Sequence, residues 1–193
     1  MRPYGLTNAA ARPSSATTSR HHRPQPHTVG HFLLGLYDGA TFRFNLKHLH
    51  GLEFSEFEDC LRVLEMDYMP EVEVHQRVDE GESVWKELME VWRTQPQEYI
   101  GRSPTDRRNA ALCPKRSKVI KSDGLRAFDN LIHVVEASTG QSRIAGLFLM
   151  SLIHPHHYRL NLTDLRGLDL KLFEDCLCML RMDYFTHAEG RTP

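Results

Sequence analysis

Three histidines lie within four consecutive positions of the chain, His154, His156 and His157. Imidazoles at close spacing are common ligands for zinc, copper and nickel, so a metal-dependent hydrolase is one function that this cluster allows. A catalytic zinc site needs three protein ligands, and no further ligand stands at a known offset from His156 and His157. Pro155 also ends the helix that would orient His154. The simpler interpretation is a polar turn between two helices, and we expect no bound metal.

Two adjacent carboxylate pairs, Glu58-Asp59 and Glu174-Asp175, are candidates for acid–base chemistry. Neighbouring residues on a helix point about 100° apart, so neither pair converges on one reacting group. Acids in the first turn of a helix are stabilised by the helix dipole, which explains these residues without any chemistry. The pairs are therefore interpreted as structural.

The remaining reactive residue types also have structural explanations. Cys60 and Cys176 fall on apolar helical stripes, no cationic group is placed to activate them, and they are expected to be buried. Asp67 and Asp183 follow the same stripes and are interpreted as turn formers. No glycine-rich phosphate loop, GxSxG, HExxH or EF-hand pattern is present. Enzyme chemistry is therefore the weaker hypothesis, and no cofactor is expected.

Charge is unevenly distributed along a chain whose formal net charge is −1. Residues 53–90 hold thirteen acids against Arg62, Arg77 and Lys86. Such a stretch binds a basic partner or mimics nucleic acid toward a DNA-handling protein. We predict a non-enzymatic protein-binding surface on five of these acids: Glu53, Glu56, Glu58, Asp59 and Glu65.

A basic segment supports an alternative partner. Residues 102–121 hold seven bases against a single acid, Asp106. Lysines and arginines bind phosphates by counterion release, so nucleic acid is the alternative. A third interpretation is that the basic segment only neutralises the acidic stretch within the molecule. The candidate nucleic-acid-binding residues are Arg107, Arg108, Lys115, Arg116 and Lys118.

A repeat organises the elements that carry these residues. The run Phe57-Glu58-Asp59-Cys60-Leu61 recurs unchanged at residues 173–177, and 19 of the 39 positions from 30 to 68 are identical to those 116 residues later. The chain is interpreted as two copies of one unit. The positions that match the histidine cluster are Asp38-Gly39-Ala40-Thr41, which could not bind a metal in the same way. A duplicated metal site is therefore excluded.

Both copies are predicted to be helical. Phe57, Cys60, Leu61 and Leu64 keep the i, i+3, i+4, i+7 spacing of a core-facing helix. Their counterparts are Phe173, Cys176, Leu177 and Leu180. A capping box at Ser55 and Glu58 predicts the start of the first of these helices, and Asn45 and Asn161 are predicted to cap short helices. Further helices are predicted over residues 29–37, 70–78, 83–92, 122–137, 142–153 and 169–184.

The predicted architecture is all-α, with two small helical units packed with pseudo-symmetry behind a disordered tail. Domains near 60 residues bury little surface alone, so the copies are expected to pack on each other or to form a homodimer. No run approaches the ~18 apolar residues of a membrane span, and the four cysteines form no CxxC pair, so we expect a cytoplasmic protein without membrane contact. The predicted segments are residues 1–28 (tail), 29–95 (copy one), 96–121 (basic linker), 122–188 (copy two) and 189–193 (tail).

The second copy also resembles a known family. The run Thr139-Gly140-Gln141-Ser142-Arg143, then Phe148-Leu149, then residues 161–165 resemble an uncharacterised family of small proteobacterial proteins, described only as a domain of unknown function. The close of copy one at Trp85 and Trp92-Arg93 is similar to the end of that domain. The family is similar to accessory proteins of bacterial mobile elements and has no assigned catalytic residues. The resemblance implies a bacterial accessory or regulatory module, present here in tandem copies.

Overall fold

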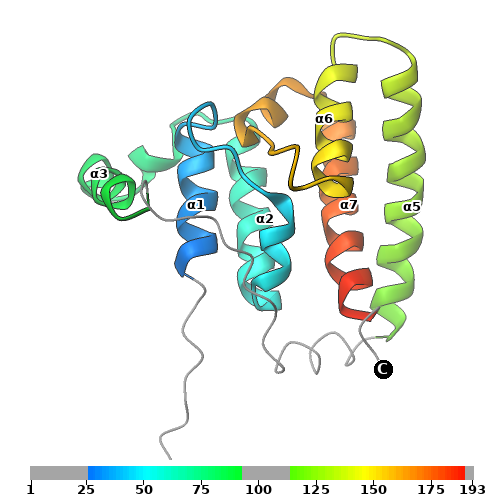
Figure 1. The fold of residues 1–193 in the computed structure, drawn as a ribbon, viewed down its shortest axis with the longest axis horizontal. Helices are drawn as coiled ribbons and strands as arrows, with labels where there is room; N and C mark the ends of the chain where they lie inside the picture. Colours follow the sequence, from blue (N-terminus) through cyan, green and yellow to red (C-terminus); the bar gives the residue numbers. More distant parts are fainter. Residues whose placement is uncertain (1–25, 93–113, 190–193) are drawn as a thin grey trace, which may run out of the picture.

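The structure is a computed structural model that describes residues 26–92 and 114–189. These residues are helical and contain no strand, which confirms the predicted all-α class (Figure 1). In chain order the α-helices are α1 (Pro26–Tyr37), α2 (Phe54–Tyr68), α3 (Gly81–Trp92), α5 (Pro114–Glu136), α6 (Ser142–Ile153) and α7 (Leu170–Glu189). The 3₁₀ helices are η1 (Leu46–Gly51), η2 (Val74–Arg77) and η3 (Leu162–Gly167).

Three elements recur at the sequence offset of 116 residues. Helices α1 and α6 begin and end at matching positions, as do η1 and η3, and α2 and α7 begin at matching positions. The Asn45 side chain accepts a hydrogen bond from the Lys47 amide at 3.0 Å, and the Asn161 side chain accepts one from the Thr163 amide at 3.2 Å. Both predicted asparagine caps are therefore confirmed. We call α1, η1 and α2 the first unit and α6, η3 and α7 the second unit.

The two units share one hydrophobic core. The predicted stripe of α2, with Phe57 and Leu61 fully buried, belongs to the same cluster as the stripe of α7, where Phe173 and Cys176 are buried. Every residue of both predicted stripes is buried. Because apolar burial is the main stabilising term in folding, each unit depends on the other to shield its apolar side chains from water.

Tyrosine hydroxyls join the two units reciprocally. The Tyr68 hydroxyl donates to the Leu168 carbonyl at 2.8 Å, and the Tyr184 hydroxyl donates to the Leu52 carbonyl at 2.9 Å. Each of these four residues matches a residue of the other bond at the offset of 116. The two hydrogen bonds therefore join corresponding atoms of the two units.

Ring stacking and a backbone bridge also join positions that correspond at the offset of 116 residues. Tyr68 stacks on Phe173 with ring centroids 4.2 Å apart, and Tyr184 stacks on Phe57 at 4.0 Å. Midway between the units, Phe44 pairs with Leu160 in an isolated antiparallel bridge, in which each amide donates to the other residue's carbonyl. Residues 44 and 160 are themselves 116 positions apart. A residue thus pairs with its own counterpart at this point.

The units differ in the helix that covers each of them. Helix α5 lies along α7 and α6 at one edge of the molecule, with Ala127 and Leu131 buried and Gly124 close against Met182 (Figure 1). A β-carbon at position 124 would overlap the Met182 side chain, so this close approach requires glycine. Helix α3 instead packs against α1 and η2 at the opposite edge.

Several predicted boundaries were wrong. Helix α5 begins at Pro114 rather than Ser122, because proline suits the first turn of a helix and Ile120 still packs against the core. Helix α2 begins at Phe54, since the capping box is formed by Glu53 and Glu56, with the Glu53 amide donating to the Glu56 carboxylate at 3.1 Å. Helix α1 begins at Pro26, within the predicted tail; residues 1–25 lie outside the described residues.

Two other helices differ in extent from the prediction. The predicted helix over residues 70–78 is reduced to η2, where only Val74 is buried. Helix α7 continues past the predicted end at Tyr184 as far as Glu189, and its added turn keeps Phe185 buried beside Phe54. An apolar residue beyond the repeated stripe thus lengthens the second unit's helix.

Candidate functional site

The five acids predicted to bind a protein do not share one face. Glu53 and Glu56 are half-buried and cap α2, whereas Asp59 is exposed and pairs with Arg62 one turn later at 2.6 Å. An exposed pair of this kind contributes little to stability, about 0–1 kcal/mol. Of these three acids, Asp59 is the one whose side chain is exposed, while Glu53 and Glu56 take part in the cap of α2.

Glu58 and Glu65 instead face an arginine of the second unit. Arg181 Nε lies 3.5 Å from a Glu58 carboxylate oxygen, and Arg181 Nη2 lies 3.5 Å from Glu65 Oε1. Glu58 is mostly buried and Glu65 is about half exposed. Position 181 is the counterpart of position 65, so the two units carry opposite charges where they meet. These two acids act at least in part in joining the units.

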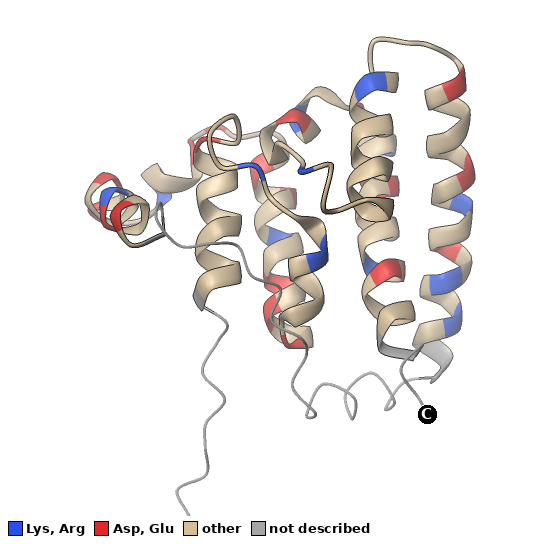
Figure 2. Cartoon of the chain, in the orientation of Figure 1, with Lys and Arg blue, Asp and Glu red and all other residues tan. Residues whose placement is uncertain are grey.

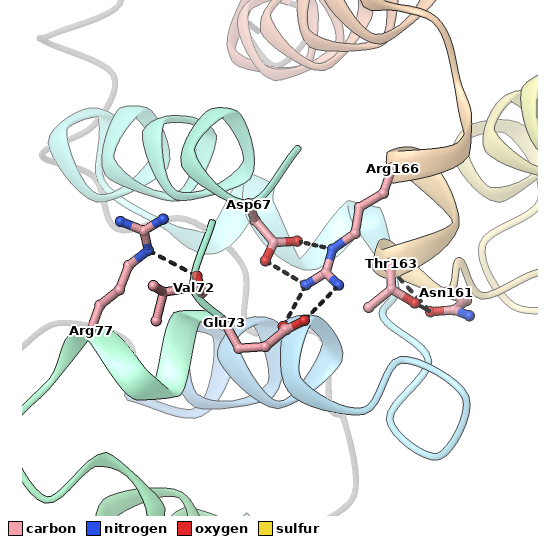
Figure 3. Close-up of polar contacts among 7 residues, drawn as sticks. All are labelled: Asp67, Val72, Glu73, Arg77, Asn161, Thr163 and Arg166. Carbon is pink, nitrogen blue, oxygen red and sulfur yellow. Dashed lines mark hydrogen bonds and ion pairs between the residues drawn. The ribbon is translucent and has the colours of Figure 1, made fainter. Parts of the chain in front are cut away.

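Asp67 is bound by an arginine of the second unit rather than acting only as a turn former. Arg166 Nε and Nη2 donate to the two Asp67 carboxylate oxygens at 3.0 and 2.7 Å, and Arg166 Nη2 also reaches Glu73 at 3.0 Å. Figure 3 shows the guanidinium between the two carboxylates. Burial raises the pKa of Asp67, which is 2% exposed, and the bidentate bond from Arg166 opposes that rise.

Asp183, the counterpart of Asp67, is bound by two bases of the first unit. His50 Nε2 lies 2.6 Å from Asp183 Oδ2, and Lys47 Nζ lies 2.7 Å from Asp183 Oδ1. Burial alone would raise the pKa of Asp183, but the His50 hydrogen bond and the charges of His50 and Lys47 lower it overall. The His187 ring stacks on His50 at 4.2 Å. The interpretation of Asp183 as a turn former therefore needs the same correction.

Two histidines of the first unit are buried in a largely apolar setting. His48 is 5% exposed, and burial, together with the charges of Arg159 and His31, lowers its pKa to about 4. Burial also lowers the pKa of His31, as do the charges of His27 and Arg159. Both imidazoles are therefore neutral at pH 7. Neither histidine was among the predicted site residues, and His31 stands where the second unit has Leu147.

A second group of exposed acids lies beyond the predicted set, in the turn after η2 and on α3. Trp85 is buried against Leu34 and Val74, which fixes the inner face of α3. The outer face carries charges, as Figure 2 shows. We define the acidic α3 surface as the five exposed acids in this part of the chain: Asp79, Glu80, Glu82, Glu87 and Glu90.

No ion pair involves these five acids among the residues that the structure describes. Lys86 is the single exposed base between residues 79 and 90. A helical projection of residues 81–92 places Glu87 and Glu90 opposite Trp85, because residues three apart on a helix share a face. A count of acids along the chain does not show which side of α3 they occupy.

The other candidate residues are not gathered into a site. His154, His156 and His157 are exposed, and within residues 26–92 and 114–189 no group of three or more histidine, cysteine or acidic side chains could hold a metal ion. Lys118 is exposed on α5. Arg107 and Arg108 lie outside the described residues, as do the side chains of Lys115 and Arg116.

Cys60 and Cys176 are buried as predicted. Burial raises the pKa of the Cys60 thiol to about 12, with smaller contributions from the charges of Glu56 and Asp59, and burial also raises the pKa of Cys176. A thiol must ionise to act as a nucleophile. Both side chains therefore act as core residues.

The fold and these residues define an all-helical protein in which polar side chains join the two units and five exposed acids lie on α3 and the turn before it. None of the helices that the structure describes is both long and apolar enough to cross a membrane. The chain belongs to a family of unknown function (DUF7673), whose model matches residues 8–93 and 125–191. No curated protein and no solved structure matches the chain.

Proposed function

We propose that the protein is a non-enzymatic accessory or regulatory module that binds a basic protein partner through the acidic α3 surface. The observation that carries this proposal is the set of five exposed acids between residues 79 and 90, a stretch that contains one base, Lys86. These acids make no ion pair within the described part of the chain. Charge of one sign on a fixed surface steers oppositely charged partners and accelerates their association.

The packing of α3 supports the same function. Trp85 anchors the helix on the first unit, with Tyr37 and His75 ring centroids 6.5 and 6.2 Å from the indole. The outer residues thus project from a helix whose inner side is ordered. A charged surface held on a packed helix presents its carboxylates in one arrangement, which favours specific rather than diffuse binding.

The cellular setting is part of the proposal and rests on the sequence resemblance. We place the protein in the cytoplasm of a bacterium, as an accessory factor of a mobile element. In that setting a basic partner would be one of the proteins that handle DNA, whose basic surfaces match an acidic helix.

The proposed function is tested by neutralising the surface. The triple variant Glu82→Gln, Glu87→Gln, Glu90→Gln should lose a basic partner that the unaltered chain retains from a nuclease-treated bacterial lysate at low salt. The matched control, Asp129→Asn, Glu136→Gln, Glu174→Gln, neutralises three exposed acids of α5 and α7 and should retain the partner. Equal retention by both variants would contradict the proposal.

A second candidate function is nucleic-acid binding. The observation that favours it is the exposed pair Lys118 and Lys121 on the first turns of α5, which continues the basic segment of the sequence. Charge reversal at Arg107, Arg108, Lys115, Arg116 and Lys118 should abolish any salt-sensitive retention of DNA. Unchanged retention would eliminate this candidate.

We also infer that the two units are tandem copies of one domain, related by an approximate two-fold rotation. The reciprocal tyrosine hydrogen bonds and the pairing of Phe44 with Leu160 support this, because a two-fold axis brings each residue near its own counterpart. An experimental structure tests the inference: superposing residues 30–68 on 146–184 should require a rotation near 180°. A rotation far from that value would refute it.

A further inference from the structure

A hollow beside α3 has the chemistry of a side-chain binding site. It has a volume of about 460 Å³ and lies between the loop that follows α1 and the helix α3. That volume falls in the range of small-ligand sites, roughly 300–1,000 Å³, and accommodates one long side chain with water. The lining residues are Asp38, Thr41, Phe42, Lys86, Met89 and Glu90.

Part of the lining is apolar. Phe42 and Met89 are partly buried and pack against the cluster formed by Leu34, Val74 and Trp85. Their inner sides are thus held by the core, while their outer sides line the hollow. An aromatic ring and a thioether offer contact to the methylene stem of a long side chain, and the ring attracts a cation.

The charged part of the lining carries two carboxylates and one amine. The Asp38 carboxylate accepts a hydrogen bond from the Thr41 amide at 3.1 Å. Hydrogen bonds from the Thr41 side chain and amide lower the pKa of Asp38, so this carboxylate stays ionised at pH 7. Neither Asp38 nor Glu90 takes part in an ion pair within the described residues, and Lys86 supplies the opposing charge.

Glu90 links the hollow to the acidic α3 surface, since it belongs to both. We propose that the hollow is the arginine-binding subsite of that surface, in which Phe42 and Met89 contact the stem of the arginine and Asp38 and Glu90 bind its guanidinium. The partner segment is therefore basic and contains an arginine. This inference rests on the proposed function, because it names the residue type through which the partner is anchored.

Arginine fits these residues better than lysine does. Its planar guanidinium stacks on an aromatic ring and donates to more than one carboxylate at once, whereas a lysine amine is a compact and strongly hydrated charge. Lys86 opposes any cationic guest, so removal of its charge should strengthen binding. The proposal therefore predicts changes of opposite sign from neighbouring residues.

The subsite is tested by titrating the full chain with a short arginine-containing basic peptide and following binding by calorimetry. The same peptide with citrulline in place of arginine keeps the shape and loses the charge, and should bind at least ten-fold more weakly. A lysine version should bind several-fold more weakly. Equal affinity for the arginine and citrulline peptides would overturn the proposal.

Variants of the lining residues test whether the peptide binds in the hollow. The double variant Asp38→Asn, Glu90→Gln should weaken the arginine peptide at least ten-fold, and asparagine at position 38 can still accept the Thr41 hydrogen bond. Lys86→Ala should strengthen binding several-fold. The matched control Asp129→Asn, Glu136→Gln should leave the affinity unchanged, and circular dichroism verifies that each variant is folded.

The outcomes separate this inference from the proposed function. If Glu82→Gln, Glu87→Gln weakens the peptide but Asp38→Asn, Glu90→Gln does not, the acidic α3 surface stands and the arginine subsite is wrong. If neither double variant changes the affinity, both are wrong. If the chain binds peptide only after the bases of residues 102–121 are neutralised, its own basic segment is the occupant and the assignment to a partner is overturned.

Discussion

Corresponding aspartates in the two units are bound by different basic side chains of the other unit. At one end of their contact, Arg166 of the second unit binds Asp67 of the first unit through two hydrogen bonds. At the matching place, His50 of the first unit binds Asp183 of the second unit. Positions 50 and 166 correspond, as do positions 67 and 183. The aspartates are the same in both units, whereas the basic side chains that bind them differ.

The difference between the covering helices is larger. The second unit keeps α5 along α7, where Asn130 donates to Asp175 at 3.2 Å. In the first unit the counterpart of Asp175 is Asp59, which is exposed and pairs only locally, with Arg62. Helix α3 covers α1 instead and carries its acids outward. The contacts between the units are thus similar on both sides, whereas the covering helices differ, and the proposed binding surface lies on the helix that covers the first unit.

The largest expected effect comes from the stacked rings that both units share. Phe57→Ala and Phe173→Ala each remove a buried ring that stacks on a tyrosine of the other unit. Truncating a buried phenylalanine costs about 3–5 kcal/mol through lost burial and the cavity left behind. Chemical denaturation should give similar losses for the two variants. A loss in only one of them would break the equivalence of the units.

The buried histidines should make the first unit sensitive to acid. His48 has a folded pKa of about 4 and an ordinary pKa of 6.5, so the unfolded chain binds more protons between these values. The free energy of unfolding is therefore unaffected by His48 above pH 6.5 and decreases as the pH falls toward 4. The expected decrease is about 3 kcal/mol, at roughly 1.4 kcal/mol per pKa unit. Denaturation measured against pH gives the slope.

Two variants sharpen that measurement. His48→Asn should flatten the pH dependence between 6.5 and 4, whereas the exposed His156→Gln should leave it unchanged. Asp183, whose pKa is lowered, loses its contribution only below its ordinary value of 3.8 and so lies outside this window. Constant stability of the wild type from pH 6.5 to 4 would disprove the role of His48.

Removing the carboxylate of Asp67 should reduce stability more than removing that of Asp183. Asp67→Asn leaves the Arg166 guanidinium with Glu73 as its remaining partner and should cost about 2 kcal/mol, below the roughly 3–5 kcal/mol of a fully buried pair because Arg166 is one quarter exposed. Asp183→Asn should cost about 1 kcal/mol, since its side chain is more exposed and asparagine can still bond to Lys47 or His50. Denaturation curves measure both changes. The reverse order would contradict the assignment.

The smallest effect tests the reciprocal hydrogen bonds. Tyr68→Phe and Tyr184→Phe each leave a carbonyl of the other unit without its donor, at a cost of about 1 kcal/mol. The loss should be larger at Tyr184, where the bond is buried. Asp59→Asn, on the exposed face of α2, is the control and should change stability by less than about 0.5 kcal/mol. A larger loss at Asp59 than at Tyr184 would contradict the packing described above.

Periodicity and repetition predicted much of the fold. The stripe of Phe57 and Leu61, the asparagine caps and the exact bounds of α6 all followed from local spacing. The start of α5 did not, because its first two turns are mostly polar in sequence and, among residues 117–121, Ile120 alone packs against the core. Local patterns predict helices well where an apolar stripe runs to the end of the helix, and poorly where it stops short.

The candidate site was predicted less well, for a different reason. Two of the five predicted acids, Glu58 and Glu65, lie near Arg181 of the second unit. A count of charges along the chain could not show this contact, because Arg181 is 116 residues from Glu65. The acidic α3 surface and the hollow beside it depend on which side of α3 packs against α1. That information lies in the tertiary contacts of Trp85 and Phe42.

The central claim is that the protein binds a basic partner through α3, the helix that covers the first unit, and not through α5, the helix that covers the second unit. The most direct measurement places a photo-crosslinking amino acid at Ser83 on α3, or at Asp129 on α5 as the matched exposed position, in the full chain expressed in bacteria. A discrete protein adduct at position 83, absent at position 129 and lost at high salt, is the predicted result. Adducts at position 129 alone, or adducts that contain only nucleic acid, would contradict the claim.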